Sequence, residues 1–435
     1  MLMLKRQVHE QLKHWYLRKD DKKALMIVGA RQVGKTTSVR EFAKEYYESV
    51  IEINFEQRPT LNSIFDGDLD ADTLLEHISV AQLGTLIPHR TLLFFDEIQS
   101  CPAARTSLKF LVEDGRYDVI ASGSLLGLQY KEVSSFPVGF EEKLEMYSLD
   151  FEEFLWAHDI SEEVIDKLRH KYEKREEVDS FIHTKFLDLF KRYMIVGGMP
   201  AVVSEYLKEK NIQDVIRVQQ NLVRGYRDDI SKYAGKRKGE AKKALDSIPL
   251  HLMKPNKKFV LGDVEKGARH REYESALHWL IDAHIGAYCF NLHNLEIPLP
   301  LYQRDNIYKF FMRDTGLLSS ISLSNVQQAI LSGNLHINEG AIVENAIADL
   351  LLKRGYHLFY YDRRGRQEID FVITHNMQVI PLEIKGGNNY KHHPSLTALL
   401  TENHKDIKKG MVLCPGNVEV TKTIDYLSLY MVMFL

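Results

Sequence analysis

The sequence predicts an α/β protein of several domains, and three observations lead to this prediction. The chain has 435 residues, more than one ordinary hydrophobic core accommodates. Short apolar runs alternate with helical stretches near both ends of the chain, as in sheets that are largely parallel. A glycine-rich motif that fits phosphate-binding loops directly follows the first apolar run. We expect three domains, over residues 1–155, 156–334 and 335–435, and a mostly helical middle domain.

The composition excludes several classes of protein. Hydrophobic residues make up 44% and charged residues 27% of the chain, as in ordinary globular proteins. No segment approaches the ~18 consecutive apolar residues of a membrane-spanning helix, so we expect no membrane partner. The 3 cysteines are far apart and form no CxxC pair, which predicts neither a zinc site nor a disulfide framework and favours the cytoplasm. The net charge is −3, so a surface that binds nucleic acid would have to be local.

Four apolar runs, at residues 24–29, 50–55, 91–95 and 119–122, are expected to be buried parallel strands. Residues 29–36 fit the pattern GxxxxGK[ST] between the first of these strands and a helix that begins near Lys35. The glycines let backbone N–H groups curl around phosphates, and the N-terminus of the helix favours negative charge. Lys35 should reach the β- and γ-phosphates of ATP, and Thr36 should bind Mg²⁺.

The third strand ends in two acids about 60 residues after this loop. Asp96 would hold the Mg²⁺ shell, and Glu97 would polarise the attacking water. Ser122 precedes Gly123 and Ser124 at the end of the fourth strand, where a polar residue either senses the γ-phosphate or belongs to an ordinary turn. The residues expected to contact ATP and Mg²⁺ are Gly29, Ala30, Arg31, Gln32, Val33, Gly34, Lys35, Thr36, Thr37, Asp96 and Ser122.

The motifs GARQVGKTT, LLFFDEIQ and ASGS, which start at residues 29, 92 and 121, resemble the AAA-type ATPase domain of a prokaryotic family. Members of that family carry a C-terminal domain related to restriction endonucleases. Later signatures at residues 136–139, 149–155 and 197–200 agree with the resemblance, which covers nearly the whole chain. It implies an AAA-type P-loop ATPase domain at residues 1–155. We expect residues 197–200, Gly-Gly-Met-Pro, to form a tight turn between helices.

The resemblance leaves the arginine finger unlocated. Relatives often carry a basic residue after Pro-Val-Gly, whereas this chain has Phe140 there and Lys143 further on. Arg31, Arg116 and Arg227 are candidates for a contact with phosphate, and each is also explained as a surface or packing arginine.

The middle region is locally basic. Between Lys232 and Arg271 there are 12 Lys or Arg and 4 Asp or Glu. Its pattern suggests a winged helix, with helices at residues 240–253 and 272–284, a turn at 262–264 and a wing strand at 288–292. A basic winged helix suggests contact with DNA phosphates. The alternative is a charge-rich exposed loop around residues 236–243 that binds nothing.

The last hundred residues contain a helix at residues 341–353 and strands at 358–361, 369–374, 379–385 and 410–413. Glu383 and Lys385 alternate along a strand and therefore share a face. A turn at residues 375–377 should bring Asp370 beside them, and Glu344 can reach them from the packed helix. Such carboxylates can bind Mg²⁺ and activate water for phosphodiester cleavage. The expected metal ligands are Glu344, Asp370 and Glu383.

This order of residues resembles the PD-(D/E)XK nuclease core. Asp370 matches its first strand acid, Glu383 its second and Lys385 its lysine, and these three are the expected catalytic residues. Two alternatives stay open. The acids either line a solvated hairpin edge and pair with arginines, or belong to a domain that keeps the fold without cutting. The arginines in question are Arg363, Arg364 and Arg366.

Two hypotheses about function follow. In the first, the nucleotide cycle of a cytoplasmic ATPase drives a DNA-directed module, with a nuclease as one candidate for that module. In the second, a nucleotide-dependent switch carries a non-catalytic C-terminal domain that binds a protein partner. A processive translocase is less favoured, because neither hexamer features nor an arginine finger are evident. The sequence gives no oligomeric state.

Overall fold

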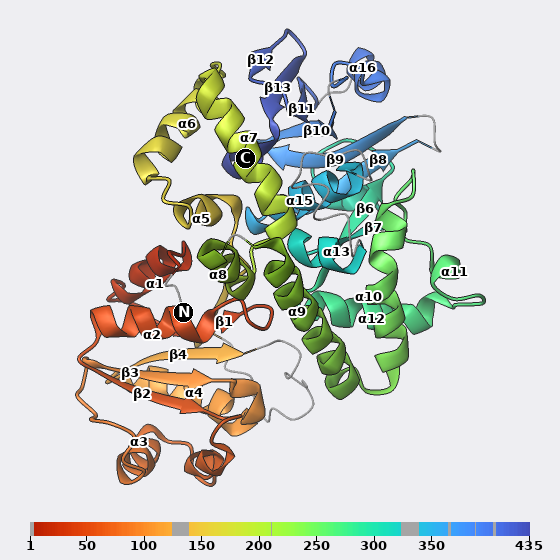
Figure 1. The fold of residues 1–435 in the computed structure, drawn as a ribbon. Coiled ribbons are helices and arrows are strands. Elements are labelled where there is room, and N and C mark those ends of the chain that lie inside the picture. The colour runs from red at the N-terminus through yellow and green to blue at the C-terminus, as the bar shows by residue number, and fades with distance from the viewer. Residues whose placement is uncertain are drawn as a thin grey trace. The chain divides into compact units, whose positions relative to one another are not determined.

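The computed structural model describes residues 4–123, 139–209, 211–322, 339–363, 367–387, 389–402 and 406–435 (Figure 1). The chain divides into two compact units. Arg6–Ser148 form the N-terminal unit, and Leu149–Leu435 together with the first few residues form the C-terminal unit.

The N-terminal unit is built on a parallel sheet of five strands in the order β2-β3-β4-β1-β5. Four of these strands, β1 to β4, are the predicted ones. The fifth was missed because its sequence, Glu-Glu-Lys-Leu-Glu, is polar, and it forms an edge strand that pairs with β1. The strands are β1 (Ala24–Val28), β2 (Ser49–Asn54), β3 (Thr91–Asp96), β4 (Asp118–Gly123) and β5 (Glu141–Glu145).

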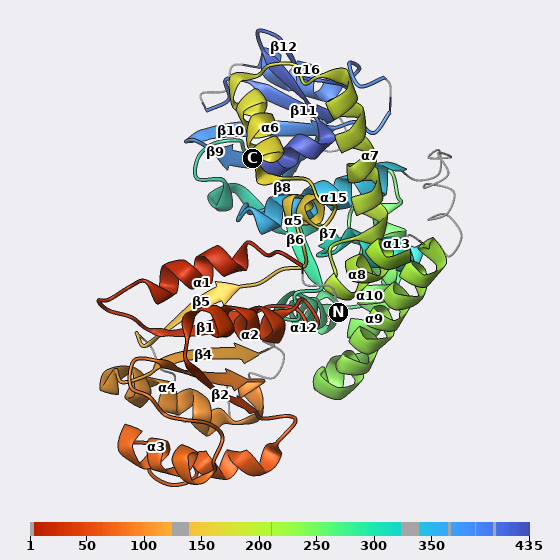
Figure 2. The same ribbon diagram turned by 60° about the vertical axis from the view of Figure 1, so that its left-hand side comes forward.

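Helices cover both faces of this sheet (Figures 1 and 2). Alternate strand residues such as Met26, Ile53 and Phe95 pack under α3 and α4 in a single apolar core. On the other face α2 buries Val39 and Phe42. The helices are α1 (Val8–Tyr16), α2 (Lys35–Tyr46), α3 (Ala71–Val80) and α4 (Pro102–Asp114), with short 3-10 helices η1 (Pro59–Phe65) and η2 (Ile98–Ser100).

The C-terminal unit contains a mixed sheet of eight strands in the order β12-β13-β11-β10-β9-β8-β6-β7. Two of its strands, β6 and β7, precede residue 335. Strand β6 lies beside β8, where Phe290 pairs with Phe359, and β7 pairs with the other side of β6. The middle region is therefore less purely helical than its sequence suggests. The strands are β6 (Gly286–Leu292), β7 (Gln303–Met312), β8 (Phe359–Asp362), β9 (Glu368–His375), β10 (Gln378–Ile384), β11 (Gly410–Cys414), β12 (Glu419–Val420) and β13 (Ile424–Ser428).

The predicted helices of this unit are present. The predicted turn at residues 262–264 is wrong, because these residues lie in the short helix α11, in which the Glu265 N–H donates to the Leu261 carbonyl at 3.1 Å. The helices are α5 (Phe151–Trp156), α6 (Glu162–Lys174), α7 (Ser180–Val196), α8 (Pro200–Glu209), α9 (Ile212–Tyr233), α10 (Lys238–Leu252), α11 (Leu261–Val264), α12 (His270–Asp282), α13 (Thr315–Ser322), α15 (Glu339–Lys353) and α16 (Pro394–Thr401), with 3-10 helices η4 (Gly235–Arg237), η5 (Leu299–Tyr302) and η6 (Leu429–Phe434).

The signature at residues 197–200 is a tight turn between α7 and α8, as predicted. Gly197 has a left-handed backbone, with φ of 74°. The Gly198 carbonyl accepts from the Leu149 N–H at 2.7 Å, and a Cβ on Gly198 would lie 2.0 Å from the Leu149 carbonyl oxygen. The Asp314 carboxylate accepts from the Gly198 N–H at 2.9 Å and from the Leu317 N–H at 3.0 Å, at the start of α13. The turn therefore depends on a close backbone approach that only glycine permits.

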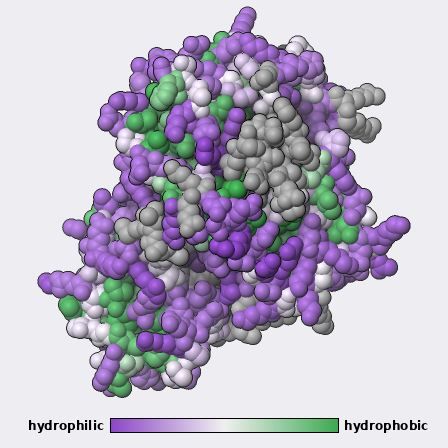
Figure 3. Space-filling view, viewed as in Figure 1, coloured by the Kyte–Doolittle hydropathy of each residue, from purple (hydrophilic) through white to green (hydrophobic). Residues whose placement is uncertain are grey.

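The visible surface is mostly hydrophilic, and hydrophobic residues occur on it in separate patches (Figure 3). Large exposed apolar side chains such as Val80, Phe181 and Met377 belong to distant segments. Among the described helices, none is both long and apolar enough to cross a bilayer.

We expect Gly198→Ala to lower the stability of the C-terminal unit by about 1–3 kcal/mol, because the added methyl group overlaps the Leu149 carbonyl. Thermal unfolding followed by circular dichroism measures this. Gly225→Ala is the control: this glycine lies within α9 with open space around its Cβ position, and alanine there should raise the unfolding temperature. Equal melting temperatures for both variants would contradict the packing argument.

Candidate functional site

The loop between β1 and α2 has a backbone that suits phosphate. Gly29 (φ 156°), Gln32 (φ 64°) and Gly34 (φ 99°) all have positive φ, which leaves successive N–H groups in the geometry of anion-binding nests. A Cβ on Gly29 would lie 2.1 Å from the Met146 carbonyl oxygen, so a side chain does not fit there. The loop is held in this shape by its own unit.

Lys35 lies across this loop. It is the first residue of α2 and is 7% exposed, and its Nζ donates to the carbonyls of Gly29 at 3.0 Å and Ala30 at 2.8 Å. Burial lowers the pKa of Lys35 to about 8, against the opposing effect of the Glu97 and Asp96 charges. A bound phosphate would offer this ammonium group negatively charged oxygens in place of two neutral carbonyls.

Asp96, the last residue of β3, is the common acceptor of the site and is 2% exposed. Its carboxylate accepts from Thr36 Oγ1 at 3.0 Å, from Asn54 Nδ2 at 2.7 Å and from Ser122 Oγ. Two oxygens about 3 Å apart match adjacent ligands of an octahedral Mg²⁺ ion with bonds of about 2.1 Å. The Thr36 and Asp96 oxygens thus fit Mg²⁺, as direct ligands or through a water in its shell.

Glu97 follows Asp96 in a left-handed conformation, with φ of 55°. Gln99 Nε2 donates to Glu97 Oε2 at 2.5 Å. Burial raises the pKa of Glu97, and the bond from Gln99 opposes this effect by favouring the charged form. A Cβ on Gly123 would lie 2.4 Å from Gln99 Oε1, so the end of β4 leaves room for this glutamine.

The remaining predicted loop residues have varied surroundings. Val33 is buried in the core, Arg31 pairs with Glu56 at 3.3 Å, and Thr37 is exposed on the first turn of α2. Ser122 donates to Asp96, so its side chain already serves the carboxylate. Ser124 and residues 136–138 of the family signature lie outside the described residues.

The other two arginine-finger candidates are engaged in ion pairs. Arg116 lies 2.7 Å from Asp114 and also pairs with Asp72. Arg227 lies 2.6 Å from Asp246. These pairs support the interpretation of both residues as surface arginines.

Two residues of the nucleotide site were missed from the sequence, Asn54 and Gln99. Asn54 ends β2, and a polar residue at the carboxyl end of a strand beside β3 is a signal that could have found it. Gln99 lies two residues beyond the acid it holds, and only its side-chain conformation reveals the contact.

The C-terminal acids also lie together, but cations already bind them. Glu344 is 1% exposed on α15. Lys309 Nζ lies 3.0 Å from Glu344 Oε1 and 3.0 Å from Glu368 Oε1, and Lys257 Nζ bonds to the other oxygen of Glu344. Burial acts to raise the pKa of Glu344, but the two ammonium groups together lower it and neutralise the carboxylate.

Asp370 and Glu383 face each other across the β9–β10 hairpin. The register pairs Phe371 with Leu382, and Asp370 Oδ2 accepts from the Ile384 N–H at 2.8 Å. Lys385 Nζ donates to Glu383 Oε1 at 2.8 Å, while Glu383 Oε2 is buried without a hydrogen-bond partner in the described part of the chain. Burial and then the Asp370 charge raise the pKa of Glu383 to about 7. The four predicted side chains form one electrostatic cluster, and their roles stay predictions.

Of the three arginines proposed as partners of these acids, the structure describes Arg363, which lies 3.6 Å from Glu402. Arg364 and Arg366 lie outside the described residues, so their pairing with the acids stays a prediction. Among the described residues, lysines bind Glu344 and Glu383. No group of three or more His, Cys, Asp or Glu placed to hold a metal ion occurs in the described ranges. The sequence analysis missed Lys257 and Lys309. A lysine between Tyr308 and Phe310 in a buried strand was a signal for the second.

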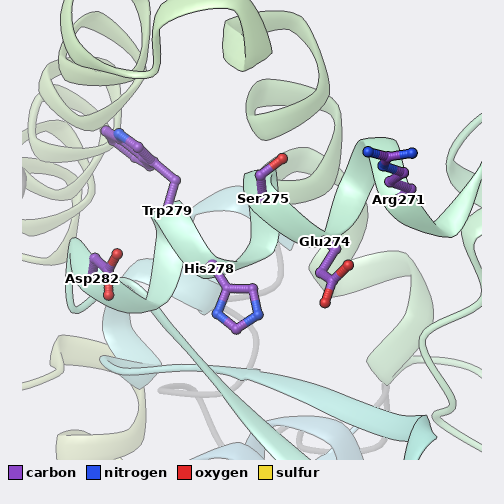
Figure 4. A pocket seen from close by; sticks show the side chains of 6 residues that line it. All are labelled: Arg271, Glu274, Ser275, His278, Trp279 and Asp282. Carbon is purple, nitrogen blue, oxygen red and sulfur yellow. The ribbon is translucent and has the colours of Figure 1, made fainter.

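A hollow of about 360 Å³ lies along α12 (Figure 4). One arginine and two acids line it, so its charge is mixed rather than basic. The indole N–H of Trp279 is buried there without a hydrogen-bond partner among the described residues. The lining side chains are Arg271, Glu274, Ser275, His278, Trp279 and Asp282.

Comparison with known families divides the chain into three matched segments. Residues 21–155 match the AAA domain. Residues 187–328 match a domain of unknown function (DUF8612), and residues 339–432 match another (DUF4143). This match supports an AAA-type P-loop ATPase domain in the first segment, and the AAA class of domain binds nucleotide.

Among individual proteins, an uncharacterized protein of Methanocaldococcus jannaschii is 25% identical over 367 residues, which cover 81% of this chain and 72% of that protein. The solved Aeropyrum pernix ORC1 protein in complex with DNA shares 14% identity over 78% of this chain and 94% of its own, with a TM-score of 0.29. AMPPCP-bound DnaA from Aquifex aeolicus shares 17% over 63% and 86%, with a TM-score of 0.24. TM-scores this low do not establish a shared overall fold.

The affinity for ATP should fall as pH rises through about 8, where the buried Lys35 loses its proton. Phosphates bind the ammonium form, so the decline should approach about tenfold per pH unit. Titration with a fluorescent ATP analogue from pH 7 to pH 10 measures it. Lys35→Arg keeps its charge and should flatten the curve; a curve for the unchanged chain that is already flat would contradict the assignment.

The same pKa affects stability without nucleotide. The usual value of 10.5 in the unfolded chain exceeds the folded value of about 8, so the unfolded state holds the proton more tightly. Stability relative to Lys35→Met should therefore rise between these two pH values.

Proposed function

We propose that the protein hydrolyses ATP with Mg²⁺ at the loop between β1 and α2. The observation that carries this proposal is the group around Asp96, whose carboxylate lies 3.0 Å from the Thr36 hydroxyl. Lys35 directly precedes Thr36, Glu97 directly follows Asp96, and the charges of both acids act on Lys35. Bound Mg²⁺ would neutralise charge on the β- and γ-phosphates. Thr36 and Asp96 are the residues that would hold it.

The remaining residues of the site would position the phosphates and accept a proton from the attacking water. Lys35 would exchange the carbonyls of Gly29 and Ala30 for phosphate oxygens. Glu97 would orient the attacking water and take its proton, and Gln99 holds this carboxylate in place. Burial raises the pKa of Glu97, which makes this carboxylate a stronger proton acceptor than an exposed one.

A second function, contact with DNA, is supported by the middle region. The order α10, α11, α12, β6, β7 is that of a winged helix, with β6 and β7 paired as an antiparallel wing. The exposed face of α12 carries the mixed charges of the hollow described above, so phosphate contact there is disfavoured. The other basic side chains that could contact phosphates lie just before the first residue of α12 and on the first turns of α10.

Much of the basic excess of this region is already paired. Arg237 lies 3.2 Å from Glu240, Lys243 lies 2.7 Å from Glu265, and Lys254 lies 2.5 Å from Asp263. The Lys236 side chain lies outside the described residues. The basic patch consists of the cations outside the hollow that form no ion pair with an acid among the described residues. These are Lys238, Lys242, Lys266 and Arg269.

The three-part division at residues 155 and 335 and the nuclease assignment are also proposals. The order α15, β9, β10 with Glu344, Asp370 and Glu383 supports a core related to restriction endonucleases. The alternative is a docking domain whose acids and lysines are structural. Incubation of the full chain with DNA, Mn²⁺ and ATP separates them, because only the first cuts DNA and loses this activity in Asp370→Asn.

Glu97→Gln should reduce ATP turnover by about 10²–10⁴-fold and leave the dissociation constant for ATP nearly unchanged, because it removes only the proton acceptor. Lys35→Ala should weaken ATP binding. Phosphate release and equilibrium titration in Mg²⁺ measure both effects. The control is Glu48→Gln, an exposed acid paired with Arg90, which should behave as the unchanged chain. Full turnover in the Glu97 variant would remove the role given to that residue.

Reversing three cations of the basic patch, Lys242→Glu, Lys266→Glu and Arg269→Glu, should weaken DNA binding. The slope of log affinity against log salt should become shallower by roughly 2–3, since each lost phosphate contact removes about 0.9. Fluorescence anisotropy at several salt concentrations measures this. Lys185→Glu with Lys208→Glu, on α7 and α8, tests for a general charge effect. An unchanged salt slope in the triple variant argues against contact at this patch.

A further inference from the structure

The segment that joins α10 to α11, residues 253–260, reaches the C-terminal acidic cluster with two adjacent lysines. Lys257 Nζ bonds to Glu344, and Lys258 Nζ lies 2.5 Å from Asp362 Oδ2. The segment precedes the sheet strands in sequence, yet it supplies one of the two ammonium groups that neutralise Glu344.

The backbone of this segment is held in an uncommon conformation at Lys257. Its φ is +47°, a left-handed value that a residue with a Cβ rarely adopts. Such strain persists only where the surroundings hold it. Here the surroundings are the contact with Glu344 and a hydrogen bond from the Lys257 N–H to the Lys254 carbonyl at 3.1 Å.

The two lysines that pair with Glu344 differ in how easily their ammonium groups can move away from its carboxylate. Lys309 belongs to β7 and has a side chain that is 0% exposed, so it is a fixed part of the core. Lys257 belongs to a connecting segment, and its side chain is 20% exposed. The ammonium group of Lys257 is therefore the cation that can withdraw to solvent without opening the sheet.

The cluster has an acceptor ready for another cation. Glu383 is 7% exposed, and its Oε2 has no hydrogen-bond partner among the described residues. Asp370 and Glu344 both act electrostatically on Glu383, so this oxygen faces an acidic surrounding. Without Lys257, the lysines that pair with this cluster among the described residues would be Lys309, on Glu344 and Glu368, and Lys385, on Glu383.

We propose that Lys257 is a removable internal counter-ion that occupies Glu344 and keeps the acidic cluster closed to divalent cations. The segment of residues 253–260 is then a strap: when Lys257 withdraws, Glu344, Asp370 and Glu383 become free to bind a divalent cation. This inference rests on the proposed cation-binding role of the C-terminal acids. It adds that a lysine of the same chain blocks the resting site, and that this lysine lies in a segment flanked in sequence by the residues of the basic patch.

The test is Mn²⁺ binding by the nucleotide-free full chain, measured by electron paramagnetic resonance of free Mn²⁺. Lys257→Gln should bind Mn²⁺ at least tenfold more tightly than the unchanged chain, and adding Asp370→Asn should abolish this gain. Lys258→Gln is the matched control, since it removes the neighbouring charge from Asp362 and leaves Glu344 paired. Hydrogen exchange gives a second measurement on the unmodified chain: saturating Mn²⁺ should increase exchange in residues 253–260.

Three outcomes overturn the inference. If Lys258→Gln gives the same gain, the effect is general charge removal. If the unchanged chain already binds Mn²⁺ as tightly as Lys257→Gln, and Asp370→Asn abolishes both, the cation site stands but the strap does not close it. If neither protein shows binding that depends on Asp370, the cation site and the strap both fail. ATP turnover should be normal in Lys257→Gln, which keeps this test separate from the ATPase proposal.

Discussion

The nucleotide site depends on a single buried carboxylate at the edge of a parallel sheet. Parallel strands end at the same edge, so Asp96 at the end of β3 is within reach of Asn54 at the end of β2 and Ser122 at the end of β4. Thr36 joins them from the first turn of α2. A hydroxyl, an amide and a second hydroxyl therefore connect three neighbouring strands and the helix of the phosphate loop through one side chain.

The buried acids of the nucleotide site and those of the C-terminal cluster have different kinds of hydrogen-bond donors. The donors to Asp96 are neutral, so the hydrogen bonds compensate for burial and leave its negative charge available to a cation. The donors to Glu344 are ammonium groups, which cancel its charge. A buried ion pair of this kind adds little net stability, because desolvation offsets most of the attraction. In the C-terminal cluster the charge of Glu344 is thus cancelled by lysines, whereas in the N-terminal site Asp96 keeps its negative charge.

Much of the N-terminal unit was predictable, because its central strands are continuous apolar runs and its loop has a defined pattern. Strand β5 was not, since Glu141–Glu145 lacks apolar character and is stabilised only by pairing with β1. In the C-terminal region the hairpin and its acids followed from the alternation of side chains along strands. Lys257 could not be placed, because no local pattern tells which carboxylate a lysine 87 residues away will meet. The same holds for the partnership of β6 with β8, which is fixed by tertiary pairing alone.

The pairing of β6 with β8 limits where this chain can be divided into fragments or joined to other domains. In the sheet β6 lies between β7 and β8, so a chain break between the end of β7 at Met312 and the start of α15 at Glu339 divides one hydrogen-bonded sheet. The downstream fragment would expose the edge of β8 to other chains, which invites edge-to-edge association. It would also lose Lys309 and Lys257 and keep a buried Glu344 without either counter-ion. In evolution, the segments that contain these strands are therefore expected to be inherited together, as one transferable module rather than two.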